Sequence, residues 1–229
     1  MSKLNTGVVL AALLLLPAPA RAQSDFSCTE VLGFSQTLEW FAAISTAELG
    51  GSVGSVELDD DEFLPGWQGR FTAGAALERW RDPEFDGWEG TTRAPAVCER
   101  HEVDRVLFNV SGSRRTAGEW ASGIIDVIEV LRTRYPDVQR VVLLPPAGPP
   151  LDGCDGVRAA RIQPSIVEGI DLALREASGE VVAGPVPRVA DCDQYADGLG
   201  HLTPEGAEHV HTEMRSAFSR QASGSTLRP

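Results

Sequence analysis

The sequence has almost no lysine: Lys3 is the only one, and every other fixed cation is an arginine. Cations of both kinds are outnumbered, with 20 Lys and Arg against 33 Asp and Glu, and the net charge is −13. Such a charge repels nucleic acids and anionic membrane surfaces, so neither is an expected partner. The abundance of Ala, Gly and Asp beside this lack of lysine indicates a bacterial source with a GC-rich genome.

Long apolar runs are also lacking, apart from one at the N-terminus. Val8–Leu16 are all apolar, Lys3 precedes them, and Pro17 and Pro19 follow. This run is shorter than the roughly 20 residues that a membrane span needs, and Ala20-Arg21-Ala22 fits the small-x-small pattern of a cleavage site. Residues 1–22 are therefore predicted to be a signal peptide. The mature chain is expected to be secreted or periplasmic, without stable membrane insertion.

Residues 23–229 have the length of a single domain with a full hydrophobic core, and a monomer is expected. The chain lacks any Cys-x-x-Cys pair, a spacing typical of zinc sites. All four cysteines lie after the predicted leader, where an even number favours disulfides. They allow three pairings. Cys28–Cys98 and Cys154–Cys192 are preferred because each pair joins segments that flank neighbouring strands of the predicted fold.

Apolar runs alternate with segments of helical periodicity along the chain. The expected strands are a short step at Val31-Leu32, then Val103–Val110, Val138–Leu144 and Glu180–Ala183, with Phe63–Phe71 either irregular or a short strand. The expected helices begin at Thr37, Ala75, Ala117, Ile162 and Pro204, the last with Thr203 as its N-cap. This alternation predicts a parallel sheet in a three-layer α/β fold. Binding groups are then expected beyond the carboxyl ends of the strands, in loops 33–36, 72–75, 109–115, 145–156 and 190–203.

Ser35 lies where the first strand turns into the first helix. A helix N-terminus offers free N–H groups and a positive partial charge, which favour a developing anion. A serine at such a position is more often simply an N-cap. His201 strengthens the functional interpretation, because it lies on a glycine-flanked loop with Asp197 four residues upstream. A carboxylate can hold such a histidine as a general base, although an exposed loop histidine is the plainer alternative.

The other histidines show no comparable pattern. His209 and His211 lie two residues apart in the last predicted helix and so face different directions. His101 lies in a charged stretch. His209 and His211 are predicted to be surface residues, and nothing around His101 supports a functional role.

Gly33-Phe34-Ser35 near the mature start and Asp197 with His201-Leu202-Thr203 near the end resemble the first and last blocks of the SGNH (GDSL-like) hydrolase family. The alternation of strands and helices follows the family's order over nearly all of the mature chain. The resemblance implies a flavodoxin-like sheet with Ser35 as nucleophile, His201 as base and Asp197 as its orienting carboxylate. No metal or organic cofactor would be needed.

Several blocks depart from the family pattern. Phe34 stands where the family has Asp before the serine, and Asp197 lies four residues before His201 instead of three, with Asp193 as a second candidate. Gly74 is the best match to the glycine that helps bind the oxyanion, and Gly69 is the next. The third block is normally Gly-x-Asn-Asp after the central strand. Here Arg114 holds the aligned Asn position, and the other candidate donors or binding residues are Asn109, Ser111 and Ser113.

The resemblance implies an exported esterase that cleaves acyl or acetyl esters, with a small-molecule or glycan-borne ester as substrate. Two alternatives stay open. One is a degenerate module that binds glycan or cell-wall material, and the other is an O-acyltransferase that uses the same residues. Trp67 and Trp88 are predicted on loops, where they could line a sugar or acyl pocket or pack in the core.

Overall fold

The computed structural model describes residues 26–43, 66–90, 98–151 and 153–222, with side chains as far as Phe218. The predicted signal peptide, residues 1–22, lies outside the described residues. Among the helices of the described ranges, none is both long and apolar enough to cross a membrane.

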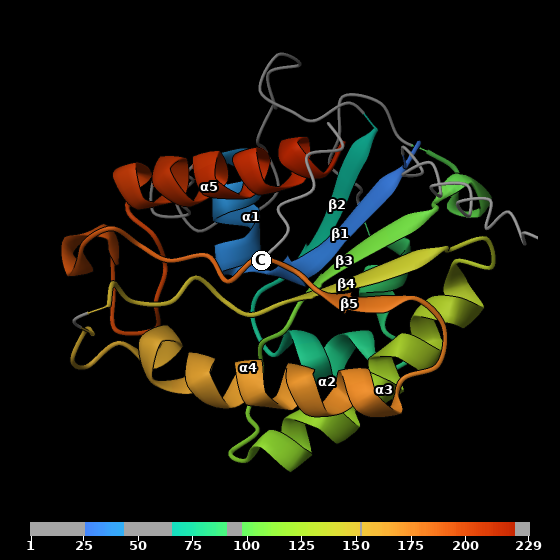
Figure 1. The fold of residues 1–229 in the computed structure, drawn as a ribbon, viewed down its shortest axis with the longest axis horizontal. Helices are drawn as coiled ribbons and strands as arrows, with labels where there is room; N and C mark the ends of the chain where they lie inside the picture. The colour runs from blue at the N-terminus through green and yellow to red at the C-terminus, as the bar shows by residue number, and fades with distance from the viewer. Residues whose placement is uncertain (1–25, 44–65, 91–97, 152, 223–229) are drawn as a thin grey trace, which may run out of the picture.

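A five-stranded sheet forms the centre of the molecule, and all of its pairings are parallel (Figure 1). Its strands are β1 (Thr29–Phe34), β2 (Trp67–Thr72), β3 (Arg105–Asn109), β4 (Arg140–Leu144) and β5 (Val181–Ala183). They are ordered β2-β1-β3-β4-β5, which is the order of flavodoxin-like folds. The predicted α/β class with a parallel sheet is therefore confirmed.

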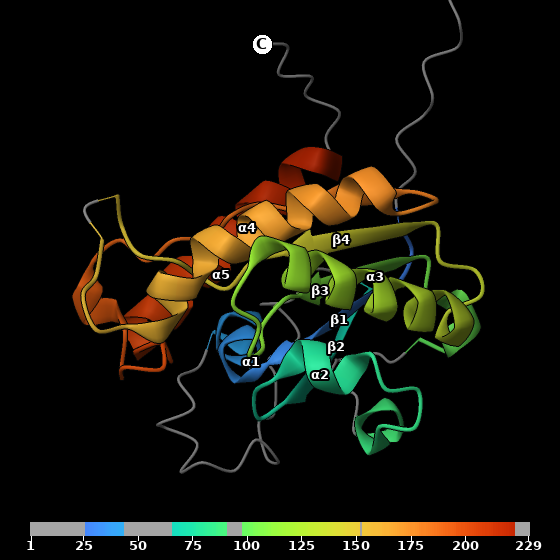
Figure 2. The ribbon, with the colours of Figure 1, turned by 90° about the horizontal axis from the view of Figure 1, so that it is seen from below.

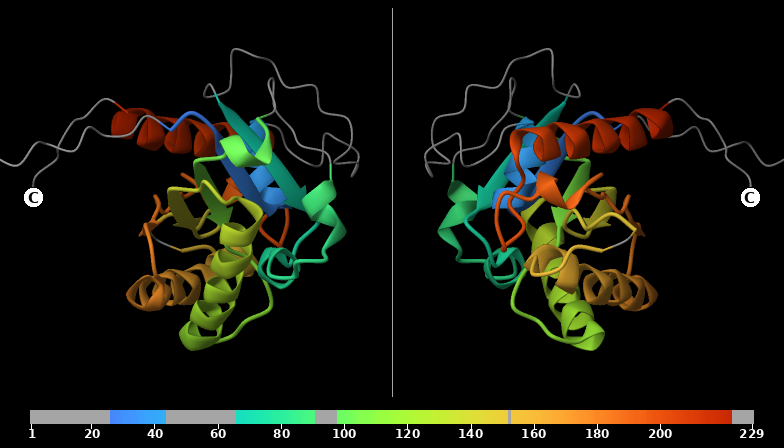
Figure 3. Two further views of the ribbon diagram at one scale, coloured as in Figure 1. Left: turned by 90° about the vertical axis from the view of Figure 1, so that its right-hand side faces the viewer. Right: turned by 90° about the vertical axis from the view of Figure 1, so that its left-hand side faces the viewer.

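Helices cover both faces of the sheet and complete three layers. One face carries α1 (Ser35–Ala42) and α5 (Pro204–Ala222), and the other carries α2 (Ala76–Trp80), α3 (Ala117–Arg134) and α4 (Arg158–Glu176). Figure 2 shows α3 and α4 side by side, and Figure 3 shows α5 across the opposite face. Alternate residues of each central strand feed the two cores, so that Phe108 and Leu143 pack beneath α3 while Leu107 and Leu144 pack beneath α5. This explains why the strands read as continuous apolar runs.

Three local predictions differ from the structure. Helix α4 begins at Arg158, one turn before the predicted start at Ile162, and Pro164 lies inside it. Trp67 begins β2 instead of lying on a loop, and Trp88 lies in a short 3₁₀ helix, Asp86–Glu89. Both tryptophans are buried in the core.

Both disulfides have the preferred pairing, Cys28–Cys98 and Cys154–Cys192. The first attaches the residue before β1 to the segment that leads into β3, at the amino ends of the strands. The second attaches the loop after β4 to the short 3₁₀ helix Cys192–Gln194, which precedes the His201 loop. The two bridges therefore reinforce opposite ends of the sheet.

A buried ion pair joins the two strands at the β2 edge of the sheet. Glu30 of β1 is fully buried, and its Oε2 lies 2.8 Å from Nη1 of Arg70 on β2 and accepts a hydrogen bond from Gln68. Arg70 also donates to the hydroxyl of Tyr135. Burial raises the pKa of Glu30 in spite of the opposing charge of Arg70. Replacement of one member would leave the other charge buried without its partner.

Candidate active site

Ser35 is the first residue of α1 and follows β1 directly. Strand β1 lies between β2 and β3. The chain goes from β1 to β2 on one side and then crosses back to β3 on the other side, so the direction of the strand order reverses at β1. Ligands in open parallel sheets bind at such a switch point, beyond the carboxyl ends of the strands. Phe34 is extended and Ser35 begins the helix, where the first backbone N–H groups have no partner within the helix.

Ser35, His201 and Asp197 form a continuous chain of hydrogen bonds. Ser35 Oγ lies 2.8 Å from His201 Nε2, and His201 Nδ1 lies 2.6 Å from Asp197 Oδ2. With Nδ1 donating to the carboxylate, Nε2 is left as the acceptor that faces the hydroxyl. A hydroxyl in this arrangement can pass its proton to the ring, and the carboxylate stabilises the charged ring that results. Asp193, the second candidate carboxylate, makes no hydrogen bond to His201 in the described structure.

The loop that carries His201 folds around Asp197. Its Oδ1 accepts hydrogen bonds from three successive backbone N–H groups, those of Leu199, Gly200 and His201. Partial burial raises the pKa of Asp197, but the hydrogen bonds from the side chain and backbone of His201 outweigh it, and the pKa lies below its ordinary value. Asp197 therefore stays ionised at neutral pH and serves both as the turn-forming residue and as the partner of the imidazole.

Two buried side chains of α1 hold this loop on either side of His201. Gln36 Nε2 donates to the carbonyl of Gly200 at 2.6 Å, and its Oε1 accepts from the backbone N–H of Ala147 at 2.8 Å. Glu39 Oε2 accepts from the N–H of Leu202 at 2.8 Å. The helix that begins with Ser35 thus fixes the residues immediately before and after His201.

Gly200 and its surroundings explain the glycine-rich composition of the loop. Gly200 has φ +100°, and a Cβ atom there would lie 2.4 Å from the Cβ of Ala159 on α4. The loop is closed by an antiparallel bridge between Tyr195 and Leu202, and the Ala196 N–H donates to the His201 carbonyl at 2.7 Å. Close packing against α4 therefore excludes a side chain at position 200.

A cavity of about 160 Å³ opens beside the Ser35 hydroxyl. Its walls come from the segments after β1, β2, β3 and β4 and before α5, together with the start of α4. The lining residues are Phe34, Ser35, Gln36, Ala73, Gly74, Ala75, Ser111, Gly112, Ser113, Pro146, Arg158, Ala159, Ile162, Leu199, Gly200 and His201. Gly74 has φ +128°, a conformation that favours glycine, and nothing lies within 4 Å of where its Cβ would be.

The structure separates the candidate oxyanion residues into two groups. Gly74, Ser111 and Ser113 line the cavity, whereas Gly69, Asn109 and Arg114 do not. Asn109 is fully buried in β3, and its amide reaches the carbonyl of Pro145 at 3.5 Å. The structure thus does not bring Asn109 to the cavity, because its side chain is buried and faces the backbone of Pro145.

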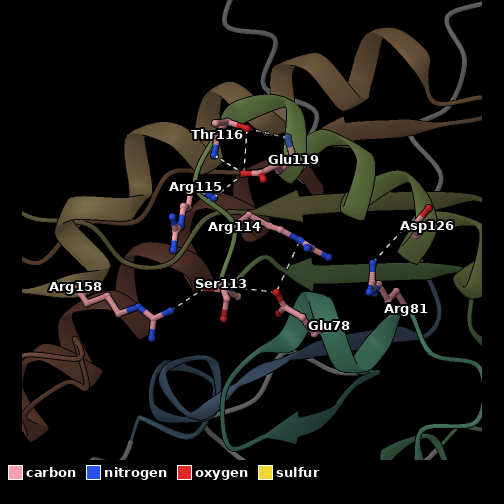
Figure 4. Close-up of polar contacts among 10 residues, drawn as sticks. Glu78, Arg81, Ser113, Arg114, Arg115, Thr116, Glu119, Asp126 and Arg158 are labelled. Carbon is pink, nitrogen blue, oxygen red and sulfur yellow. Dashed lines mark hydrogen bonds and ion pairs between the residues drawn. The ribbon is translucent and has the colours of Figure 1, made fainter.

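Arg114 is turned away from the cavity toward α2. Its Nε lies 3.8 Å from Glu78 Oε1, and the same carboxylate accepts from the backbone N–H of Ser113 at 3.0 Å (Figure 4). The next turn of chain is fixed by Glu119, whose carboxylate accepts from the N–H groups of Arg115 and Thr116. Glu78 and Glu119 therefore hold the loop so that Ser111 and Ser113, and not Arg114, border the cavity.

Sequence reasoning missed Gln36, Glu39 and Arg158. Gln36 and Glu39 could have been noticed in the sequence, because they lie at i and i+3 on a helix whose other long side chains are apolar. Arg158 carried none, because the start of α4 was expected one turn later and Arg158 then belonged to an unassigned loop. Its position in the cavity wall depends on how α4 packs beside β3 and β4.

The remaining histidines lie away from the cavity. His209 faces Glu213 at 3.8 Å, and His101 is exposed. His211 is not simply a surface residue, because its Nδ1 lies 2.9 Å from the carbonyl oxygen of Trp40 and so links α5 to α1. Within the described ranges, no three His, Cys, Asp or Glu side chains gather as metal ligands would.

Comparison with known proteins gives a likeness in fold. No protein-family model matches the sequence, and no curated protein matches it either. Among solved structures, an active-site mutant of a family two carbohydrate esterase from Clostridium thermocellum matches with a TM-score of 0.51 and 13% identity, over 91% of this chain. This chain spans 66% of that protein's length.

Two further structures have lower TM-scores. An acetyl xylan esterase from the rumen bacterium Butyrivibrio proteoclasticus has a TM-score of 0.47 at 13% identity, covering 87% of this chain and 66% of its own. A carbohydrate esterase of family 3 from Talaromyces cellulolyticus has a TM-score of 0.46 at 18% identity, covering 87% of this chain and all of its own.

Proposed function

We propose that this chain is an exported serine esterase of the SGNH type that removes short acyl groups, acetyl above all, from carbohydrates. The observation that carries the proposal is the chain of contacts from Ser35 Oγ through His201 to Asp197, at 2.8 and 2.6 Å. It lies at the edge of the sheet where ligands of parallel α/β folds bind. The likeness in fold to a carbohydrate esterase agrees with this assignment.

The reaction begins with attack of Ser35 Oγ on the ester carbonyl carbon while His201 Nε2 takes the hydroxyl proton. The backbone N–H groups of Ser35 and Gly74 stabilise the negative charge that develops on the carbonyl oxygen. His201 then gives the proton to the departing alcohol oxygen and leaves an acyl group on Ser35. Water, deprotonated by His201, attacks this acyl group and releases the carboxylic acid. Asp197 stabilises the charged imidazole in both halves of the reaction.

The size of the cavity supports a short acyl group. Its volume, about 160 Å³, is small beside the 300–1,000 Å³ typical of pockets for drug-sized ligands. An acetyl group has two carbon atoms and fits such a space, whereas a long acyl chain does not. The contacts at Ser35 also favour turnover over a degenerate binding module, since binding alone requires no hydroxyl held by an imidazole.

The test combines a chain-length panel with labelling. The exported chain, with both disulfides formed, is expected to hydrolyse 4-nitrophenyl acetate faster than the butyrate and octanoate esters and to react with a fluorophosphonate probe. Ser35→Ala should lose both activities, with a drop in kcat of about 10⁴-fold or more. Ser178→Ala, an exposed serine far from the cavity, is the matched control and should match the wild type. Hydrolysis that survives Ser35→Ala would refute the proposal.

A further inference from the structure

The catalytic cavity has an unusual charge for this protein. The whole chain has 33 acidic against 20 Lys and Arg side chains, yet the described residues that line the cavity include no Asp or Glu. Arg158 is the one arginine among them, and there is no lysine. Two carboxylates close behind the wall, Asp197 and Glu78, are bonded to His201 and Ser113, whereas the positive charge of Arg158 lies in the lining itself and favours an anionic ligand group there.

Arg158 is held in place while most of its donors stay available. It is the first residue of α4, and Nη2 donates to the carbonyl of Gly112, in the loop between β3 and α3, at 2.9 Å (Figure 4). The residue as a whole is exposed, and within the described part of the chain no carboxylate forms an ion pair with it. A guanidinium with one nitrogen fixed and the others free is suited to bind a carboxylate through two parallel hydrogen bonds.

Arg158 lies at the boundary between two cavities. Arg158 and Leu199 lie between the catalytic cavity and a second, wider cavity of about 790 Å³. Among the described residues, the second cavity is also lined by Arg161 and by one carboxylate, that of Asp155. A substrate whose ester enters the first cavity can extend past Arg158 toward Arg161 and Asp155.

Aromatic stacking, the usual way to hold a neutral sugar ring, has little support around this site. All five tryptophans of the chain are buried in the core and none lines either cavity: Trp40, Trp67, Trp80, Trp88 and Trp120. Among the described residues, Phe34 is the one aromatic side chain in the two linings. Charge and hydrogen bonds are what these walls offer instead.

We propose that Arg158 binds a carboxylate of the substrate, so that the preferred substrates are short-acyl esters of acidic, uronate-containing carbohydrates. This inference rests on the esterase function proposed above and names its substrate class. A charge-assisted contact of this kind favours the charged substrate by about tenfold.

The test compares two substrates that differ in a single group. Mono-acetylated methyl glucuronoside and methyl glucoside, acetylated at the same hydroxyl, carry a carboxylate or a hydroxymethyl group at the same carbon. The wild type should show a kcat/KM about tenfold higher for the glucuronoside, and added salt should reduce this ratio. In Arg158→Gln the ratio should fall to about one. Arg175→Gln removes the same charge from the other end of α4, about 25 Å away along the helix, and should keep the wild-type ratio.

Each other result decides against the inference. If Arg158→Gln keeps the preference, or lowers kcat/KM equally for both substrates, the arginine only supports the Gly112 loop. If the wild type hydrolyses both sugars and 4-nitrophenyl acetate but without preference, the esterase assignment stands and the acidic substrate class is wrong. If the wild type hydrolyses none of the three esters, the proposed function fails and this inference fails with it.

Discussion

Gln36 and Gly200 are joined by a 2.6 Å hydrogen bond although 164 residues separate them in the chain. The bond links the residue after Ser35 to the residue before His201, and the other end of the same amide holds Ala147. The hydroxyl of Tyr195 donates to the carbonyl of Ala147 at 2.9 Å, so the backbone of this one residue after β4 is bonded both to the helix of Ser35 and to the segment that leads to His201. We therefore propose that Gln36 is a positioning residue for the proposed reaction.

Gln36→Leu should lower kcat more than it raises KM. The substitution leaves the Gly200 carbonyl and the Ala147 N–H buried without this partner, which costs about 1–3 kcal/mol of stability for each group. A displacement of His201 by about 1 Å is expected to reduce kcat by about 100-fold. Steady-state kinetics on 4-nitrophenyl acetate, at a temperature where the variant is folded, measures the split. Gln139→Leu, an exposed glutamine, is the control and should leave kcat unchanged. Unchanged kcat in folded Gln36→Leu would mean that the amide supports the fold alone.

Asp197→Asn should reduce kcat by between about 10²- and 10⁴-fold, because an amide neither stabilises the charged imidazole nor enforces its tautomer. Asp193→Asn is the matched control, since that carboxylate does not contact His201. Equal losses in the two variants would contradict the assignment of Asp197.

Asp197 also gives a test of how stability depends on pH. The folded-state pKa of Asp197 lies below its ordinary value of about 4. The ionised carboxylate therefore contributes its full stabilisation of the fold above the ordinary pKa, and this stabilisation is lost as pH falls through the folded-state pKa. The stability difference between wild type and Asp197→Asn should therefore shrink in urea titrations carried out at successively lower pH. The difference at neutral pH should be below about 1 kcal/mol, because the side chain is 42% exposed. A difference that grows on acidification would show that the sign is wrong.

The two disulfides should differ in their effect on activity. Removal of either by paired Cys→Ser substitution is expected to cost about 2–4 kcal/mol of stability. Loss of Cys154–Cys192 should also lower kcat, because Cys192 begins the segment that leads to Asp197 and His201. Loss of Cys28–Cys98, at the amino ends of the strands, should leave kcat near the wild-type value in the folded protein. Thermal unfolding and kinetics on both double variants separate the two effects, and equal kcat losses would count against the assignment.

Arg70→Leu should destabilise the fold by about 3–5 kcal/mol at neutral pH, because the Glu30 carboxyl group would be left buried without its partner. The double variant Glu30→Gln/Arg70→Leu should recover most of this loss. Burial already raises the pKa of Glu30 in the wild type. When the pKa of a carboxyl group is higher in the folded protein than in the unfolded chain, the folded protein loses stability as pH rises through that folded-state pKa. The deficit of Arg70→Leu should therefore be smaller at pH 4 than at pH 7 in denaturant titrations. A deficit independent of pH would assign the loss to packing and not to charge.

Much of this organisation was predictable from local sequence. The apolar runs of β3 and β4 and the helical periodicity of α3 gave the α/β class, because burial on both faces of a sheet demands those patterns. Ser35 could be singled out because it lies at a helix start, where the chain itself supplies free N–H groups. His201 could be singled out because it lies on a glycine-flanked loop four residues after Asp197. Thr203 and Pro204 gave the start of α5 in the same way, and Thr203 Oγ1 accepts from the Gly206 N–H. These are properties of a few neighbouring residues.

Tertiary structure decided what depends on distant segments. Asn109 and Arg114 were candidates by position in the chain, but the packing of β3 against β4 and of α2 beside the loop turns both side chains away from the cavity. The choice of Asp197 over Asp193 follows from a turn closed by three backbone N–H groups. Gln36 and Arg158 acquire meaning through contacts with Gly200 and Gly112, which the folded sheet brings to them from far along the chain. Local sequence determines the helices and strands and where they end. Which side chains meet at the carboxyl ends of the strands depends on how the helices and loops pack against the whole sheet.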